Sequence, residues 1–280
     1  MIKLEKIMEL RQPYISAASG LVLLDDKFFV VSDDENFIGI FDTNFQTSVS
    51  LPIFSEVLPE EAKLRKSMKN DFEALVHLPL QKQLLLIPSG STLKRGRGAV
   101  VNERGELLRE ISFQSLYSQL RKDFPELNIE GAIIQDEEIW LFQRGNGAQN
   151  KNAIISFNLN DFLKATTVTY KIKLIDLGAV ENVNYSFTDA TKSDKNILFL
   201  AVAENSSSTY LDGQVLGTKL GLMNASGEIL AMTALETTSK SEGICFHPQS
   251  QHFYVVTDDD NRHLPSTLYR GRLPTDWKDL

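Results

Sequence analysis

Five oxygen-bearing side chains recur at nearly equal intervals along the chain, each at the start of an apolar run. They stand 54 to 58 residues apart, and they are Ser19, Glu73, Glu130, Thr188 and Glu242. Three carboxylates brought close together repel one another unless a cation neutralises them. Oxygen ligands without histidine or cysteine suit a hard divalent cation, chiefly Ca²⁺, and Mg²⁺ prefers the same kind of ligand. If the fold gathers these five side chains, the sequence predicts a metal site.

A second set of polar residues follows the next apolar run of each repeat. These loops occupy residues 32–36, 88–92, 144–147, 204–207 and 257–262. We assign Asp33 and Asp34 as candidate general bases acting on a metal-bound water. Arg144 is the candidate clamp for an anionic substrate, because a guanidinium binds such groups with two parallel hydrogen bonds. We expect further substrate contacts from Ser89, Ser91, Asn146, Glu204, Asn205 and Asp258.

A structural role is the alternative for both sets. The acids would then hydrogen-bond backbone N–H groups of neighbouring repeats without any ion, and most loop residues would only form polar turns. Recurrence alone does not separate these hypotheses, because internal duplication copies a structural residue as readily as a ligand. We favour the metal for the five repeated residues, since purely structural contacts need not converge on one axis.

The spacing itself predicts the architecture. Counted through the two chain ends, the distance from Glu242 to Ser19 is 57 residues, so the chain divides into five parts without a remainder. A period in the fifties with strand-like content is typical of a β-propeller with four-stranded blades. The sequence therefore predicts an all-β protein, a five-bladed β-propeller forming a single domain over residues 1–280. In such a blade the first strand lies innermost, so the five residues and the polar loops would open at one mouth of the central channel.

Each repeat divides into strands separated by turn residues. Blades one and two are predicted at 20–24, 28–32, 37–41 and 47–52, then 73–78, 83–88, 98–102 and 106–112. Blades three and four are predicted at 130–134, 139–143, 153–158 and 166–174, then 189–192, 197–203, 219–223 and 228–233. Blade five has only three, at 242–247, 252–257 and 267–273, so we expect the N-terminal run 2–10 to supply its fourth strand. Short helices are predicted near 59–65 and 115–122.

Composition argues against several classes of protein, namely nucleic-acid-binding, membrane-spanning and disulfide-rich proteins. A net charge of −8 argues against nucleic-acid binding, which needs clustered Lys and Arg. No apolar run approaches membrane-spanning length, and the alternating N-terminal run lacks the apolar core of a signal peptide. The single cysteine, Cys245, excludes an internal disulfide framework. We therefore expect a cytoplasmic monomer whose partner is a small anionic ligand.

Several phrases of the sequence resemble an uncharacterised family of bacterial β-propeller proteins, over nearly the whole chain. They are Asn70-Asp71-Phe72-Glu73-Ala74-Leu75, Pro88-Ser89-Gly90-Ser91-Thr92, Phe124-Pro125-Glu126-Leu127-Asn128-Ile129-Glu130-Gly131-Ala132, Gln143-Arg144-Gly145-Asn146-Gly147 and Phe187-Thr188-Asp189-Ala190-Thr191. This resemblance implies a propeller fold and brings no established activity with it.

More distantly, the order of the five repeated residues is similar to that of the calcium-activated nucleotidases, which are five-bladed propellers. The resemblance implies a calcium ion at the axis, with the same five residues as its ligands. The Asp-Asp pair of their first loop is matched by Asp33 and Asp34. Of the Arg pair in their third loop only Arg144 is kept, and their Lys-Glu-Trp and Lys-Ser-Glu-Glu loops are missing. The chain thus has fewer cations to bind a nucleotide.

The sequence leads to two hypotheses from different classes. The first is a metal-dependent hydrolase of a small anionic substrate, a phosphoester, a phosphoanhydride or a lactone. The second is a non-catalytic propeller that binds a ligand or a protein, with a structural ion or none.

Overall fold

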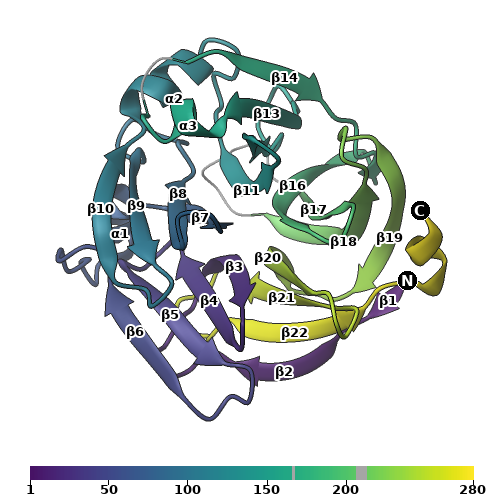
Figure 1. Ribbon diagram of the computed structural model, residues 1–280, viewed down its shortest axis with the longest axis horizontal. Coiled ribbons are helices and arrows are strands. Elements are labelled where there is room, and N and C mark those ends of the chain that lie inside the picture. The colour runs from purple at the N-terminus through teal and green to yellow at the C-terminus, as the bar shows by residue number, and fades with distance from the viewer. Residues whose placement is uncertain (166–167, 206–212) are drawn as a thin grey trace.

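The computed structural model describes residues 1–165, 168–205 and 213–280, and its strands form five sheets arranged around a central axis (Figure 1). The innermost strands β3, β7, β11, β16 and β20 contact one another in a closed ring, each touching the next and the last touching the first. This arrangement confirms the predicted five-bladed β-propeller. The repeat period predicted the number of blades because every blade repeats the same antiparallel hairpins.

The blades have the following strands. Blade one contains β3 (Ala18–Leu24), β4 (Lys27–Ser32), β5 (Phe37–Asp42) and β6 (Ser48–Pro52). Blade two contains β7 (Phe72–Leu78), β8 (Gln83–Pro88), β9 (Arg97–Asn102) and β10 (Leu107–Ser112). Blade three contains β11 (Ile129–Gln135), β12 (Glu138–Gln143), β13 (Ala153–Asn158) and β14 (Tyr170–Leu174). Blade four contains β15 (Ala179–Val180), β16 (Val183–Lys192), β17 (Ile197–Asn205), β18 (Gln214–Met223) and β19 (Ile229–Glu236). Blade five contains β20 (Lys240–His247), β21 (His252–Asp258) and β22 (Thr267–Arg272).

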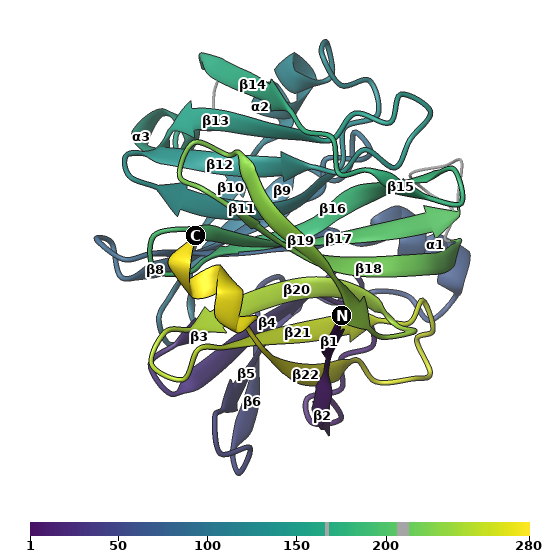
Figure 2. The same cartoon turned by 90° about the vertical axis from the view of Figure 1, so that its right-hand side faces the viewer.

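The N-terminal segment closes the ring, as predicted, but it is divided between two blades. Strand β2 (Glu5–Glu9) pairs antiparallel with β22 and is the fourth strand of blade five. Strand β1 (Ile2–Lys3) instead pairs parallel with β19 of blade four, beside the C-terminal end of the chain (Figure 2). Leu4 between them is buried in a cluster with Leu235 and Trp277. Burial of this side chain explains why the chain changes sheets at that point.

Other predicted bounds also changed. In blade four, β16 begins at Val183 rather than 189, β18 begins at Gln214 rather than 219, and β15 was not predicted. Helix α1 (Ala62–Met68) begins after its predicted start, whereas α2 (Gln114–Leu120) lies where it was predicted. Helix α3 (Leu159–Phe162) and the 3₁₀ helix η1 (Thr275–Asp279) were not predicted. Strand β14 begins at Tyr170, and residues 166–167 of its predicted range lie outside the described residues.

The core consists of apolar layers between neighbouring blades. Between blades one and two, for example, Phe29 and Val31 pack with Leu75, Leu84 and Leu86. Layers of this kind fix the angle between blades and hold the inner strands at a common axis. Among the described residues no helix has the length and apolar character needed to cross a membrane.

Candidate functional site

The five repeated residues occupy one equivalent position in the five blades. In each blade the register between the innermost strand and the next shifts once, and the residue left without a ladder partner is Ser19, Glu73, Glu130, Thr188 or Glu242. Such a β-bulge bends its strand and redirects a side chain. The bulges therefore place the five predicted residues at the same end of the channel.

The inner strands approach one another closely just below these bulges. A Cβ atom at Gly20 would lie 2.9 Å from the backbone nitrogen of Leu75, and one at Gly243 would lie 2.9 Å from the carbonyl oxygen of Ser19. Blade four has Asp189 at the equivalent position. Its carboxylate accepts hydrogen bonds from the N–H groups of Ala190 (2.7 Å) and Ile244 (2.8 Å), and so ties blade four to blade five.

The two hydroxyl-bearing members also join neighbouring blades. The Ser19 hydroxyl donates to the carbonyl oxygen of Phe72, and the Thr188 hydroxyl donates to that of Ser241 at 2.7 Å. In both cases the acceptor belongs to the innermost strand of the next blade. These two side chains thus join neighbouring blades, although through carbonyl oxygens rather than the N–H groups that the structural hypothesis named, and their oxygens keep lone pairs for a cation.

Two of the three repeated glutamates surround the side chain of Arg144. The Arg144 guanidinium lies 3.3 Å from Glu130 and 3.7 Å from Glu242, and it donates to Glu204 at 2.5 Å. Lys240 adds a second cation, 2.9 Å from Glu242. We call these five residues the Arg144 group. Arg144 therefore lies at the mouth among the acids, where it was predicted, but its side chain is only 4% exposed and already contacts three carboxylates.

The third glutamate, Glu73, belongs to a different set of charges. Lys69 Nζ contacts Asp33 and lies 3.2 Å from both Asp34 and Asp71, while Arg95 lies 2.9 Å from Asp71. Glu73 completes this set, which we call the Lys69 group; its six members are Asp33, Asp34, Lys69, Asp71, Glu73 and Arg95.

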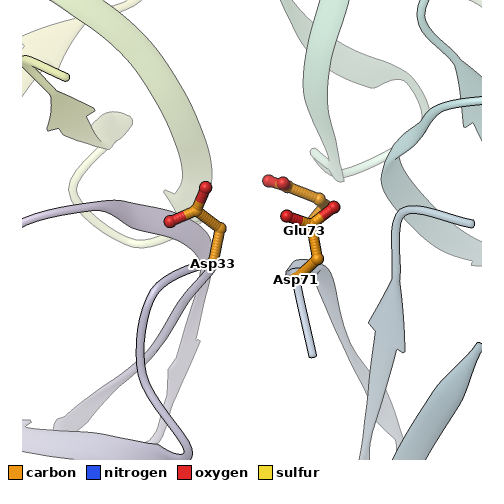
Figure 3. A group of neighbouring side chains, drawn as sticks. All are labelled: Asp33, Asp71 and Glu73. Carbon is orange, nitrogen blue, oxygen red and sulfur yellow. The ribbon is translucent and has the colours of Figure 1, made fainter. Parts of the chain in front are cut away.

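Three acids of the Lys69 group lie close enough together that they could hold a metal ion. One carboxylate oxygen from each of Asp33, Asp71 and Glu73 lies within 4.8 Å of the other two, a grouping of acids, histidines or cysteines found once among the described residues (Figure 3). The second oxygen of Asp33, Oδ1, is buried and has no hydrogen-bond partner. Glu73 has neither a hydrogen bond nor an ion pair with any described residue. Oxygen ligands with an unsatisfied buried atom fit a divalent cation such as Ca²⁺ or Mg²⁺.

Burial shifts the acidity of these carboxyl groups. It raises the pKa of Asp33 to about 7, an effect that Lys69 opposes and that Asp34 and Asp71 increase. Burial, together with Glu130, Asp71 and Asp33, raises the pKa of Glu73 well above its ordinary value. Burial alone would raise the pKa of Asp71 as well. The positive charges of Lys69 and Arg95 have the larger combined effect, and the pKa of Asp71 is lower than its ordinary value. Glu73 is therefore the member whose ionised form most needs a further cation.

Other predicted residues take supporting positions. The Ser89 hydroxyl donates to Asp71, and Ser91 lies 2.8 Å from Ser89 and accepts from Arg95 at 2.7 Å. Both serines thus help to hold Asp71. Glu204 belongs to the Arg144 group, whereas Asn205 is exposed.

The remaining predicted contacts are Asn146 and Asp258. Asn146 is half-buried, and its side-chain oxygen has no hydrogen-bond partner among the described residues. Asp258 is buried and lines a cavity of about 210 Å³ together with Asp33, Asp34 and Lys69. The Lys69 group therefore has an open side, which a small molecule could reach.

The sequence argument missed Asp71, Lys69, Arg95 and Lys240. Asp71 lies only two residues before Glu73, but it precedes strand β7 and Glu73 lies at the β-bulge, so the alternation of side chains along a strand did not place the two together. Lys69 had no signal in the repeat, because it follows helix α1 in an insertion between blades one and two.

The chain matches a protein family of unknown function, DUF6929, over residues 14–273. No curated protein gives a significant match. These comparisons lend no support to the more distant resemblance to the calcium-activated nucleotidases.

Among solved structures, the chain is similar to three enzymes at the level of the fold. For glutaminyl cyclase of Myxococcus xanthus, the identity is 12% and the TM-score 0.54, covering 97% of this chain and 96% of that one. For a luciferin-regenerating enzyme the values are 10% and 0.54, covering 98% and 96%. For virginiamycin B lyase of Staphylococcus aureus they are 10% and 0.52, covering 98% and 100%. The family match, which spans most of the sequence, is the more specific finding: this protein belongs to DUF6929, a family of unknown function.

Proposed function

We propose that the protein is a metal-dependent hydrolase of a small anionic substrate, with a divalent cation of the Ca²⁺ type held by Asp33, Asp71 and Glu73. The observation that carries this proposal is the convergence of three carboxylates from two blades, one of which, Asp33, has a buried oxygen without a hydrogen-bond partner. Of the five ligands expected from the repeat, Glu73 keeps that role. Asp33 changes from a candidate base to a ligand, because one of its carboxylate oxygens lies within 4.8 Å of an oxygen of each of the other two acids.

The charge balance supports a cation at this place. The Lys69 group has four carboxylates and two cationic side chains, so its fully ionised form has two uncompensated negative charges. One divalent cation would neutralise them. In the Arg144 group each glutamate contacts a cationic side chain, and Lys240 also lies 3.6 Å from Asp260, so no carboxylate there lacks a protein cation as Glu73 does.

The substrate would bind in the cavity of about 210 Å³ beside the Lys69 group. A bound divalent cation would polarise a substrate oxygen and lower the pKa of a neighbouring water. Asp34 lines the same cavity and is the candidate base that takes the proton of that water. Lys69 and Lys66 also line the cavity and can attract the anionic part of a substrate. A volume of about 210 Å³ favours a compact phosphoester or lactone over a nucleotide.

Thermal unfolding of chelator-treated protein, titrated with Ca²⁺ and with Mg²⁺, tests the metal. A ligand that binds only the folded state stabilises it by about 2.7 kcal/mol at a hundredfold excess over its Kd, which we expect as a rise of several degrees in Tm. Glu73→Gln should abolish this rise. Glu130→Gln is the matched control, because it makes the same change at the same bulge in another blade, and it should retain the rise.

If Glu73→Gln and Glu130→Gln lose the metal-dependent increase in Tm equally, the ion binds on the axis instead. If neither metal increases the Tm of the original chain, the protein holds no such ion and the metal-dependent proposal is wrong. Hydrolysis is then tested with phosphate esters and lactones, each with cation and with chelator. Metal binding without cation-dependent turnover of any substrate would leave a binding protein with a structural ion.

A further inference from the structure

The opposite end of the channel contains a second cavity with a different chemical character. It has a volume of about 390 Å³ and is lined by residues 21–23, 75–77, 132–134, 190–192 and 245–246 of the five inner strands, together with Pro79. We call it the lower chamber. Pockets for small molecules commonly have volumes of roughly 300–1,000 Å³ and walls that are mostly apolar. The lower chamber meets both conditions.

The lower chamber is separate from the carboxylates at the mouth. Thr188 forms the bulge at the mouth, Asp189 follows it, and Ala190 already lines the lower chamber. The Asp189 carboxylate spans the inner strands of blades four and five at this level through its bonds to Ala190 and Ile244. A ligand in the lower chamber would therefore lie on the other side of Asp189 from the Lys69 group.

The charges of the two ends differ in sign. Among the described residues that line the lower chamber none carries a carboxylate, and the nitrogen-bearing ionisable side chains are those of His77 and Lys192. His77 Nε2 lies 2.9 Å from Glu103, which supplies a counter-charge. Lys192 is exposed and donates to the neutral amide oxygen of Gln135 at 2.7 Å, with no carboxylate partner among the described residues. In a protein of net charge −8, this chamber thus combines an apolar wall with an uncompensated ammonium group.

We propose that the lower chamber binds a small carboxylate with an apolar body, such as a medium-chain fatty acid, whose head group pairs with Lys192. The apolar body would be buried against the aliphatic side chains of the inner strands, where removal of apolar surface from water is favourable. The carboxylate would remain at the rim and accept charge-assisted hydrogen bonds from the two free N–H groups of the Lys192 ammonium. This site needs no metal and does not rest on the proposed hydrolase activity.

Isothermal titration with decanoate, in the presence of chelator and below the concentration at which decanoate self-associates, tests the proposal. We expect one binding site, with decanol and butyrate each binding at least about tenfold more weakly, since decanol lacks the charge and butyrate lacks the apolar area. Lys192→Gln should weaken decanoate binding by about tenfold and leave decanol binding unchanged. Lys195→Gln is the matched control, because this exposed lysine lies three residues away and outside the lining of the chamber. It should have no effect.

A second variant tests the position of the apolar body. Thr191→Phe fills the chamber from a half-buried lining position and should remove decanoate binding without changing the unfolding midpoint. The proposal is overturned if decanoate does not bind, if Lys192→Gln and Lys195→Gln weaken it equally, or if folded Thr191→Phe binds it as well as the original chain does.

Discussion

The Arg144 group and the Lys69 group hold similar numbers of charges at one mouth, but they compensate them differently. In the Arg144 group a buried guanidinium contacts three glutamates at once, and Lys240 pairs again with Glu242. In the Lys69 group the ammonium contacts three aspartates and leaves Glu73 without a partner. In the first group a protein cation contacts every carboxylate, whereas in the second we propose that a divalent cation from solution compensates Glu73.

This difference shows that residues at equivalent backbone positions can have different charged neighbours. Glu73 and Glu130 are both unpaired residues of a β-bulge at the start of an inner strand. Their neighbours differ, because Arg144 reaches Glu130 from its own blade and the side chain of Asn128 donates to it at 2.6 Å. Internal duplication repeats the backbone position, and the side chains of the surrounding segments set the charges around each copy.

Removal of Arg144 should have the largest effect on stability. Arg144→Met leaves Glu130 and Glu204 without their cation, and loss of one partner of a buried ion pair costs about 3–5 kcal/mol. Urea unfolding measures this loss. Arg104→Met, at a largely exposed arginine, is the control and should change the free energy of unfolding by less than about 0.5 kcal/mol. A comparable small change for Arg144→Met would mean that water, rather than Arg144, compensates these acids.

Lys69→Met should destabilise the chelator-treated protein by about 3 kcal/mol, for the same physical reason. The two groups should then respond differently to added Ca²⁺. Because the Lys69 group can accept a cation from solution, saturating Ca²⁺ should recover much of the loss in Lys69→Met and none of it in Arg144→Met. Equal recovery in both variants, measured by urea unfolding, would break the distinction between the groups.

The sequence predicted the fold well because its signal was repeated five times. The spacing of the five residues, the short polar turns and the missing fourth strand of blade five together fixed the number of blades and the role of β2. The division of the N-terminal run between β1 and β2 was not predictable, because it depends on the burial of Leu4 against residues far away in the chain.

The candidate site was predictable only in its backbone positions. The spacing indicated which residues would face the mouth, but it carried no information on where a long side chain would point. The sequence therefore suggested that Arg144 binds a substrate. Only the fold shows that its guanidinium donates a hydrogen bond to Glu204, 60 residues later in the chain. Lys69 contributes from outside the repeat, so no periodic pattern could include it.

The pH dependence of stability should also separate the groups. Burial raises the pKa values of Asp33 and Glu130 to about 7, so the folded chain binds these protons more tightly than the unfolded chain does. The stability that these groups contribute is present in acid and is lost as the pH rises from about 4, their ordinary pKa, to about 7, by on the order of 1–3 kcal/mol. Urea unfolding at several pH values in chelator measures the loss.

Added Ca²⁺ should remove the share of this loss that belongs to Asp33, because the ion favours the ionised carboxylate. The variant Asp33→Asn measures the contribution of Asp33 to this loss of stability, and Glu130→Gln measures the contribution of Glu130. If Ca²⁺ suppresses the share that Glu130→Gln removes, then the ion lies beside the Arg144 group and the comparison is reversed.

Loss of the Ser19 or Thr188 hydroxyl should have the smallest effect, and it bears on the place of the metal. Thr188→Val keeps the shape of the side chain but leaves the Ser241 carbonyl oxygen without its donor, which costs about 1 kcal/mol. Ser19→Ala does the same to the carbonyl oxygen of Phe72. With the ion held by Asp33, Asp71 and Glu73, both variants should keep the full rise of Tm with Ca²⁺. An ion on the axis with all five repeated residues as ligands would instead lose affinity in both. These small changes therefore discriminate between the two sites more cleanly than the large ones, because they disturb none of the charges at the mouth.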